Sequence, residues 1–205
     1  PYTPGVEAAG VIEAVGPWVT EFNVGDRVGY HFIPGAYAES RVVSTQQLIH
    51  IPEGISSEEA AAMLVKGFTA RMLVKVIQPI KPGDVVLVHA AAGGVGTLVT
   101  KWAKALGATV IGTTGSEEKK AIVLANGADY VFLAECREFV HSVLEITDGR
   151  GVDVVFDGVG KDTFSYSLDV IRKGCKIVLY GSSSGQPEHI DHALLRERDI
   201  IMATP

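Results

Sequence analysis

The chain has 205 residues, of which 47% are hydrophobic and 20% are charged, and its net charge is −6 at pH 7. This balance is that of a globular protein with one large domain or two small ones. The acidic charge, without a block of Lys and Arg, argues against nucleic acid as the main partner. No stretch reaches the roughly 18 uncharged apolar residues of a membrane span. No signal segment is visible either, although organelle targeting stays open because the chain begins with Pro1.

Residues 1–66 predict a small β-rich domain. We expect strands at residues 6–15, 27–31, 37–43 and 48–51, separated by turns rich in Pro and Gly. The segment Ser56-Ser57-Glu58-Glu59 predicts a helix start, and an Ala-rich run leads from it into a helix near residues 67–77.

Residues 67–205 predict a second domain in which strands alternate with helices. Strands are expected at 85–88, 109–113, 130–133, 152–156, 176–180 and 200–203. Helices are expected at 94–106, 116–125, about 137–146, about 162–172 and about 191–197. This alternation predicts an α/β fold, a Rossmann-type doubly wound sheet of six parallel strands with right-handed crossovers.

The strongest motif is the segment Ala91-Ala92-Gly93-Gly94-Val95-Gly96, between the first of these strands and its helix. It matches the fingerprint G-x-G-x-x-G, except that Ala91 takes the place of the first Gly. Small residues let the backbone approach a pyrophosphate, and a helix N-terminus offers free N–H groups. We therefore expect a dinucleotide here; the alternative is a tight turn without a ligand.

The next strand end distinguishes NADPH from NADH. NAD-binding sites carry an acidic residue there for the ribose hydroxyls, but this chain reads Thr113-Thr114-Gly115-Ser116. Gly115 and Ser116 would not repel a 2′-phosphate, and Lys119 can offer it a positive charge. Glu117 and Glu118 should point away from it. The sequence thus favours NADPH, with a routine solvated Lys119 as the alternative.

Two further loops follow later strands, Asp157-Gly158-Val159-Gly160 and Tyr180-Gly181-Ser182-Ser183-Ser184-Gly185. We expect them to line the nicotinamide half of the cofactor, because dinucleotides lie across the carboxyl ends of such strands. The alternative is two ordinary polar turns. The serines lack a G-x-S-x-G elbow, so a hydrolase is not supported.

The cysteines and histidines predict no metal site. Cys136 and Cys175 lie far apart and make no disulfide framework, so we expect reduced thiols in a reducing compartment such as the cytoplasm. The six histidines are scattered without zinc-ligand spacing, and we expect them at the surface or hydrogen-bonded internally. They are His31, His50, His89, His141, His189 and His192.

Taken together, these motifs resemble the zeta-crystallin-type quinone oxidoreductases, in the zinc-free branch of the medium-chain dehydrogenase/reductase superfamily. The resemblance runs along essentially the whole chain. Its segments are residues 4–10 (PGVEAAG), 25–28 (GDRV), 35–39 (GAYAE), 66–70 (KGFTA), 89–96 (HAAAGGVG), 102–108 (WAKALGA) and 156–160 (FDGVG).

The resemblance implies part of a GroES-like catalytic domain at 1–66, a Rossmann domain at 67–205, and a chain that is a fragment of a longer protein. Zinc enzymes of the superfamily carry His where this chain has Val6, and they insert a four-cysteine lobe that is absent here. We therefore expect no metal. The family usually has Tyr where this chain has Ala134, which weakens one expected cofactor contact.

The resemblance also implies the cofactor contacts. Thr69 should lie near the nicotinamide and the Gly-rich turn at the pyrophosphate. The segment with Gly115, Ser116 and Lys119 should hold the 2′-phosphate, and the loops at 158–159 and 180–183 should line the nicotinamide end. The implied residues are Thr69, Gly93, Gly94, Val95, Gly115, Ser116, Lys119, Gly158, Val159, Tyr180, Gly181, Ser182 and Ser183.

The function that this implies is NADPH-dependent reduction of quinones without a metal. No residue is a convincing proton donor, and transfer of one or two electrons stays open. One alternative is reduction of α,β-unsaturated carbonyls, and another is a non-catalytic crystallin-like or RNA-binding role. We expect a homodimer joined at the last strand, because the apolar run Ile200-Ile201-Met202-Ala203 should form the sheet edge.

Overall fold

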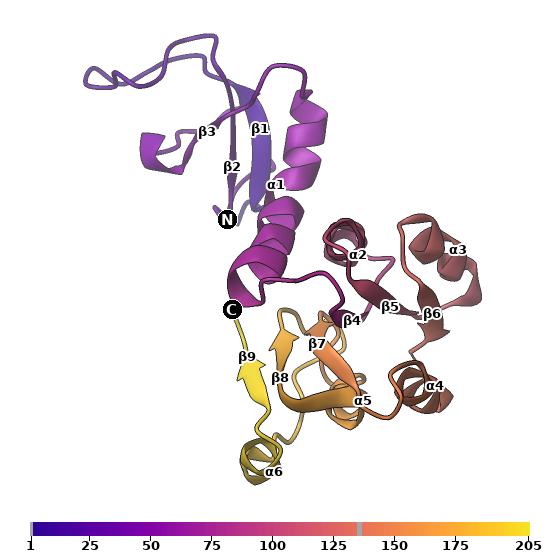
Figure 1. Ribbon diagram of the computed structural model, residues 1–205. Coiled ribbons are helices and arrows are strands. Elements are labelled where there is room, and N and C mark those ends of the chain that lie inside the picture. The colour runs from indigo at the N-terminus through magenta and orange to yellow at the C-terminus, as the bar shows by residue number, and fades with distance from the viewer. Residues whose placement is uncertain (1, 135–136) are drawn as a thin grey trace. The chain divides into compact units, whose positions relative to one another are not determined.

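The computed structural model describes residues 2–134 and 137–205, and it divides into two compact units, Pro1–Phe68 (unit 1) and Thr69–Pro205 (unit 2) (Figure 1). Glu135 and Cys136 lie outside the described residues, so the prediction of a reduced thiol applies here to Cys175, which is a free cysteine.

Unit 1 is built on a three-stranded antiparallel sheet in the order β1-β2-β3. The strands are β1 (Glu7–Val11), β2 (Arg27–His31) and β3 (Ile49–His50), and a 3-10 turn covers Thr45–Gln47. The strand predicted at 37–43 was wrong. Its alternating apolar residues meet no partner strand in the described chain, and the Val42 side chain is 96% exposed.

Helix α1 (Ser57–Arg71) begins in unit 1 at the predicted start. The Ser56 hydroxyl accepts a hydrogen bond from the Glu59 N–H (3.1 Å), and the Glu59 carboxylate accepts one from the Ser56 N–H (2.8 Å). This reciprocal capping box fixes the first turn. A π-helical segment (Met72–Ile77) continues α1, so the helix expected near 67–77 is the far end of a longer one.

Unit 2 is a doubly wound sheet of six parallel strands in the order β6-β5-β4-β7-β8-β9. This order confirms the predicted Rossmann-type fold. The strands are β4 (Val85–Val88), β5 (Thr109–Thr114), β6 (Tyr130–Leu133), β7 (Val152–Asp157), β8 (Ile171–Leu179) and β9 (Ile201–Ala203). The helices are α2 (Gly94–Ala105), α3 (Glu117–Ala125), α4 (Glu138–Ile146), α5 (Phe164–Val170) and α6 (His192–Glu197).

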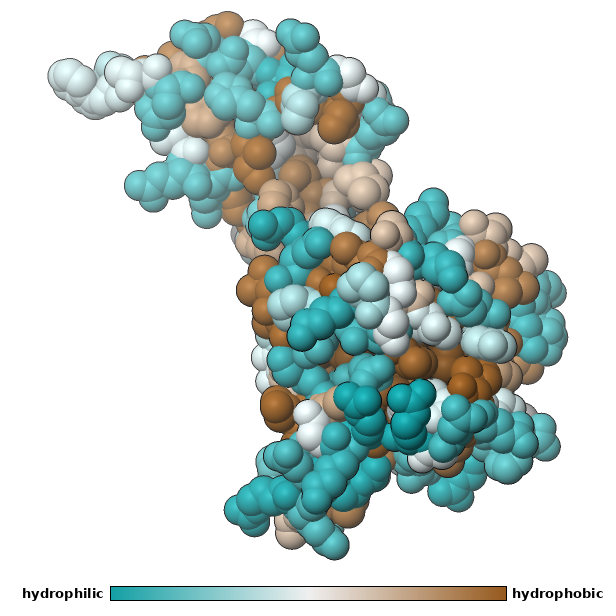
Figure 2. Space-filling model, viewed as in Figure 1, coloured by the Kyte–Doolittle hydropathy of each residue, from teal (hydrophilic) through white to brown (hydrophobic). Residues whose placement is uncertain are grey.

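The core of unit 2 lies on both faces of the sheet, because successive side chains of a strand point to opposite faces. In β4, Val86 and Val88 pack into the cluster that includes α2 residues, whereas Leu87 packs into the cluster with Phe139 of α4. Because both faces of β4 are covered, its sequence is a continuous apolar run, as the sequence analysis expected for a buried parallel strand. The surface carries hydrophobic patches among hydrophilic residues (Figure 2).

The largest difference from the predicted boundaries in unit 2 lies where α5 meets β8. Helix α5 ends at Val170, two residues before the expected end, and β8 begins at once with Ile171 paired to Val152. The register then shifts before Val154 pairs with Lys176, so the pairing of β7 with β8 is irregular at this point.

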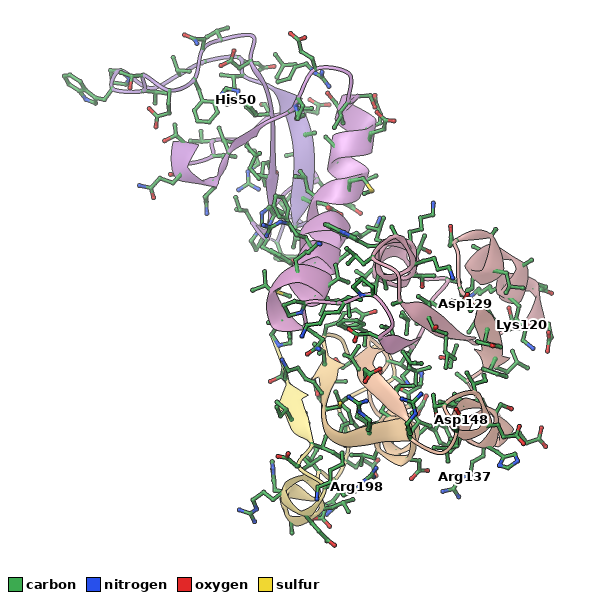
Figure 3. All side chains as sticks on the ribbon, viewed as in Figure 1. His50, Lys120, Asp129, Arg137, Asp148 and Arg198 are labelled. Atoms are coloured by element: carbon green, nitrogen blue, oxygen red, sulfur yellow. The ribbon has the colours of Figure 1, made fainter. Side chains whose placement is uncertain are left out.

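Polar side chains hold the ends of these elements. Arg198 donates hydrogen bonds to the carbonyls of Leu168 (2.6 Å) and Ile171 (2.9 Å), near the end of α5 (Figure 3). Asp129 accepts one from the Val110 N–H (2.8 Å) and pairs with Lys104 (2.5 Å), which joins the start of β6 to β5 and α2. These contacts satisfy backbone groups that packing alone leaves without a partner.

Candidate functional site

The candidate cofactor site is the carboxyl edge of the sheet in unit 2. Strands β5, β4, β7 and β8 are consecutive neighbours and parallel, so the loops that follow them emerge side by side. These loops and the first turns of α2 and α3 carry all the predicted cofactor residues except Thr69. Such an edge, beside the reversal of strand order between β4 and β7, is where doubly wound sheets bind ligands.

The Gly-rich turn has the geometry that close backbone approach requires. Gly93 precedes the first residue of α2, and no side chain caps that helix start. A Cβ atom on Gly96 would overlap the Ala90 carbonyl oxygen and lie 2.9 Å from Ala91 Cα. Gly96 therefore lets α2 pack against the end of β4, and the first N–H groups of α2 are left for an anionic ligand.

The turn between β5 and α3 carries hydroxyls without a protein partner. The side-chain oxygens of Thr114 and Ser116 are buried, and neither has a hydrogen-bond partner in the described structure. Such groups cost free energy unless a ligand or water satisfies them. Lys119, one turn into α3, is exposed, and Glu117 is exposed and paired with Lys120 (2.8 Å). The two hydroxyls and the Lys119 ammonium can donate to a phosphate, whereas residues 113–116 include no carboxylate to accept hydrogen bonds from a ribose diol.

Asp157 organises the loop after β7. Its carboxylate is fully buried and accepts hydrogen bonds from the N–H groups of Val159 (2.9 Å) and Gly160 (3.0 Å). It also accepts hydrogen bonds from the hydroxyls of Thr163 (2.8 Å) and Ser167 (3.0 Å) on the α5 side. The sequence analysis named this loop but missed the carboxylate as its anchor, because the anchoring depends on donors up to ten residues away.

The loop after β8 packs directly on the loop after β7. The Ser183 N–H bonds to the Gly158 carbonyl (3.3 Å), and the Ser184 hydroxyl donates to the Val159 carbonyl (2.9 Å). A Cβ atom on Gly158 would lie 2.8 Å from the Tyr180 ring, and one on Gly181 would lie 2.8 Å from the Gly158 oxygen. Both glycines are therefore required by contact, and the two loops form one surface.

Tyr180 is held in its neutral form within this surface. Burial raises the pKa of its phenol, and the negative charge of Asp157 raises the pKa further. The hydroxyl therefore keeps its proton at neutral pH and can act as a hydrogen-bond donor.

Two further positions that the sequence analysis named do not belong to these loops. Thr69 lies on α1 and is partly buried, and the described structure gives it no hydrogen bond to the loops. Ala134 directly follows β6, and its N–H bonds to the Thr114 carbonyl (3.0 Å). Its methyl group cannot supply the aromatic contact that the family resemblance implies at this position.

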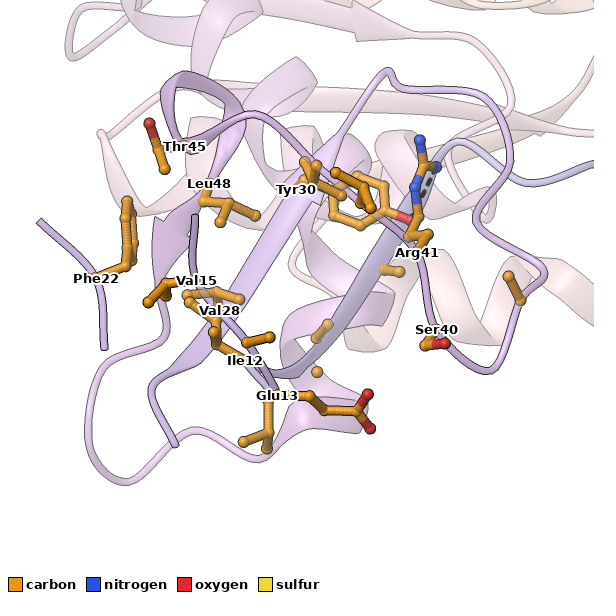
Figure 4. Close-up of a pocket in the computed structure, with 18 of the residues that line it drawn as sticks. Ile12, Glu13, Val15, Phe22, Val28, Tyr30, Ser40, Arg41, Thr45 and Leu48 are labelled. Carbon is orange, nitrogen blue, oxygen red and sulfur yellow. Dashed lines mark hydrogen bonds between the residues drawn. The ribbon is translucent and has the colours of Figure 1, made fainter. Parts of the chain in front are cut away.

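Unit 1 contains a cavity of about 750 Å³ beside β1, β2 and the segment 36–43 (Figure 4). Arg41, one of the charged residues that line it, donates to the Tyr30 hydroxyl (3.2 Å) and to the Pro34 carbonyl (2.8 Å). The cavity lies within unit 1, and none of the predicted cofactor residues lines it.

The position expected to have lost a zinc ligand, Val6, directly precedes β1 and is 41% exposed. Across residues 2–134 and 137–205, no three His, Cys, Asp or Glu side chains are gathered as a metal site would need. The helices of that same part of the chain include none with the length and apolarity to span a bilayer.

Comparison with protein families gives two matches. Residues 94–204 match the family described as zinc-binding dehydrogenase, and residues 1–53 match the alcohol dehydrogenase GroES-like domain.

Individual proteins are also similar to the chain. A quinone oxidoreductase of Pseudomonas aeruginosa is 41% identical over 201 residues, which are 98% of this chain and 62% of that protein. A 2-haloacrylate reductase of a Burkholderia species is 43% identical over 193 residues, 93% of this chain and 58% of that one. The crystal structure of Escherichia coli quinone oxidoreductase complexed with NADPH superimposes with a TM-score of 0.95 at 38% identity. That match covers 100% of this chain and 64% of the crystallised one, so the chain spans less than two thirds of these relatives.

Proposed function

This chain belongs to the zinc-binding dehydrogenase family, and from that premise we propose that it is part of an NADPH-dependent quinone reductase that works without a metal. The observation that carries the proposal is the carboxyl edge of unit 2, where a Gly-rich turn and buried hydroxyls without partners lie on neighbouring strands. Two of the similar proteins support it by what they bind or are named for: one is a quinone oxidoreductase, and another was crystallised with NADPH.

We assign the pyrophosphate to the start of α2. The backbone of Gly93, Gly94 and Val95 would approach it, since no side chain caps this helix start and two of the three residues are glycines. The 2′-phosphate goes to Gly115, Ser116 and Lys119. A Cβ on Gly115 would meet nothing within 4 Å, so that side of the turn is open, and the buried Ser116 hydroxyl gains the partner that it lacks.

We assign the nicotinamide end to the paired loops after β7 and β8. Gly158, Val159 and Gly181 bring backbone atoms close, and the neutral Tyr180 would act with Ser182, Ser183 and Thr69 in orienting the ring. When bound, NADPH supplies the hydride. The chain's own residues bind and orient it, which lowers the entropic part of the barrier.

A titration tests the cofactor assignment. The chain should bind NADPH more tightly than NADH, and it should oxidise NADPH when a benzoquinone is added. Equal affinity for both cofactors would overturn the assignment of the β5–α3 turn. Absence of any NADPH binding would overturn the proposed function.

A second candidate function is reduction of α,β-unsaturated carbonyl compounds. The observation in its favour is the 43% identity to a 2-haloacrylate reductase, whose substrate is an unsaturated carboxylate. Turnover of a quinone and of 2-chloroacrylate, measured side by side with NADPH, separates the two functions. A faster reaction with the acrylate would replace quinone reduction as the conclusion.

We further propose a homodimer formed through β9, the edge strand of the unit 2 sheet. Ile201 on this strand is 52% exposed, and a bare apolar edge favours pairing with another strand. The free thiol of Cys175 supports a reducing location, for which we propose the cytoplasm. Light scattering tests the first proposal and cell fractionation the second.

A further inference from the structure

A buried histidine lies beneath the candidate cofactor site. His89 follows the last residue of β4 and precedes the Gly-rich turn, and its side chain is fully buried. Its Nδ1 atom is 2.8 Å from the Thr113 hydroxyl of β5. Its Nε2 atom is buried and has no partner in the described structure. A buried imidazole with only one of its two nitrogens hydrogen-bonded costs folding free energy. This cost suggests that His89 has a role beyond packing.

The surroundings of His89 come from three neighbouring elements. Thr113 faces it from β5, the Phe139 ring of α4 meets it edge-on at 6.1 Å between centroids, and Asp157 of β7 acts on it through its charge. Burial lowers the pKa of His89, and the negative charge of Asp157 opposes that shift. The imidazole is therefore neutral at physiological pH, and Asp157 stays available to the loop that it anchors.

The backbone around His89 joins the turn after β4 to the carboxyl ends of strands β5 and β7. The His89 N–H bonds to the Phe156 carbonyl (2.9 Å), next to Asp157, and the Ala91 N–H bonds to the Thr113 carbonyl (2.9 Å). Between them, Ala90 adopts a left-handed conformation (φ 50°) that costs free energy for a residue with a Cβ. The Ala90 carbonyl in turn accepts the Gly93 N–H (2.8 Å).

We propose that His89 is a positioning residue for the dinucleotide, which fixes the Gly-rich turn and the 113–116 turn relative to each other through its bond to Thr113. This inference rests on the proposed cofactor function. Ala90 has a strained conformation, so the turn needs other contacts to stay ordered. A turn that became ordered only when the dinucleotide binds would lower the affinity for the dinucleotide. His89 itself touches no cofactor atom in this assignment; it acts through Thr113 and Ala90.

The test measures the binding of NADP+ to the full chain by calorimetry at pH 7.5. Replacing the bond partner, Thr113→Val, or the ring nitrogens, His89→Phe, should each weaken NADP+ binding about fivefold, the scale of one lost hydrogen bond. The double variant should be no weaker than the worse single variant, because both remove the same contact. His89→Asn keeps a polar atom near Nδ1 and should recover most of the affinity.

Two controls separate positioning from simple loss of stability. Val143→Ala removes buried methyl groups of α4 on the same side of the sheet, and should lower the unfolding temperature while leaving NADP+ affinity unchanged. His141→Phe makes the same change at an exposed histidine and should affect neither property.

The outcomes are distinct. If His89→Phe does not fold, Thr113→Val and His89→Asn still decide the question. Unchanged affinity in Thr113→Val, or no recovery by His89→Asn relative to a folded His89→Phe, would overturn the positioning role while the parent still binds NADP+. A parent that binds no NADP+ would overturn this proposal together with the proposed function.

Discussion

The two units differ in how fully their sheets are covered. In unit 2, strands β4 and β7 are almost entirely buried, because helices and neighbouring strands cover both faces. In unit 1, β3 is exposed, β1 is partly exposed, and a cavity opens beside them. The loops of unit 2 are therefore held by packing within unit 2 itself. Substitutions in its tightly packed turns should lower the unfolding free energy more than equivalent substitutions in unit 1.

The largest effect is expected from Gly96→Ala. The added Cβ would overlap the Ala90 carbonyl and approach Ala91, so the turn must shift. We expect a loss of about 3 kcal/mol in unfolding free energy, at the upper end for overpacking, and no measurable NADPH binding. The matched change Gly10→Ala on β1 meets nothing within 4 Å and should cost little. Chemical denaturation of both variants measures this difference; equal losses would contradict the comparison.

The edge of the unit 2 sheet provides the next contrast. Ile201→Lys puts a charge on β9, where we propose that two chains pair, and should convert dimers to monomers. Ile122→Lys is the matched control, because Ile122 on α3 is 51% exposed and lies away from that edge. Light scattering over a range of concentrations reads the mass. A parent that is monomeric at high micromolar concentration would contradict edge pairing in this chain.

Removing the charge of Lys119 should weaken NADPH binding by about 1–2 kcal/mol, the scale of a charge-assisted hydrogen bond. NADH binding should not change, since it has no 2′-phosphate. Lys101→Ala, two turns into α2 and also exposed, serves as the control. If Lys119→Ala weakened the binding of NADPH and NADH equally, our assignment of Lys119 to the 2′-phosphate would be wrong.

Acid should destabilise unit 2 through His89. Burial lowers the pKa of this imidazole in the folded state, so below about pH 6.5 the unfolded chain binds a proton that the folded chain does not. As the pH is lowered below about 6.5, the unfolding free energy should therefore decrease, by at most about 1.4 kcal/mol per pH unit. Above about pH 6.5 the stabilisation is fully present. His89→Asn should flatten this slope, whereas His141→Asn at an exposed site should not. Denaturation at pH 5.5, 6.5 and 7.5 measures it.

The smallest effect is expected from chelation. Because Val6 cannot ligate zinc, the purified protein should contain well under one zinc per chain. Treatment with a chelator should change neither its stability nor its cofactor affinity. Elemental analysis that found one tightly held zinc per chain would show that unit 1 has a metal site of another kind.

The sequence by itself determined most of unit 2. The buried runs such as Val85–Val88, the helical period that follows, and the Gly-rich turn between them depend on local patterns, and the sheet order confirmed the fold that they predict. The resemblance to quinone oxidoreductases is confirmed as well, by relatives that match nearly the whole chain.

Tertiary structure alone decided what depends on distant partners. The segment 37–43 has a strand pattern but no strand beside it, and β8 begins early because Ile171 pairs with Val152. Likewise, His89 reads as one scattered histidine until β5 brings Thr113 to its ring. Hydrogen-bond partners and burial are properties of the packed chain, whereas periodicity and turn chemistry are properties of neighbouring residues, and only the latter can be read from the sequence.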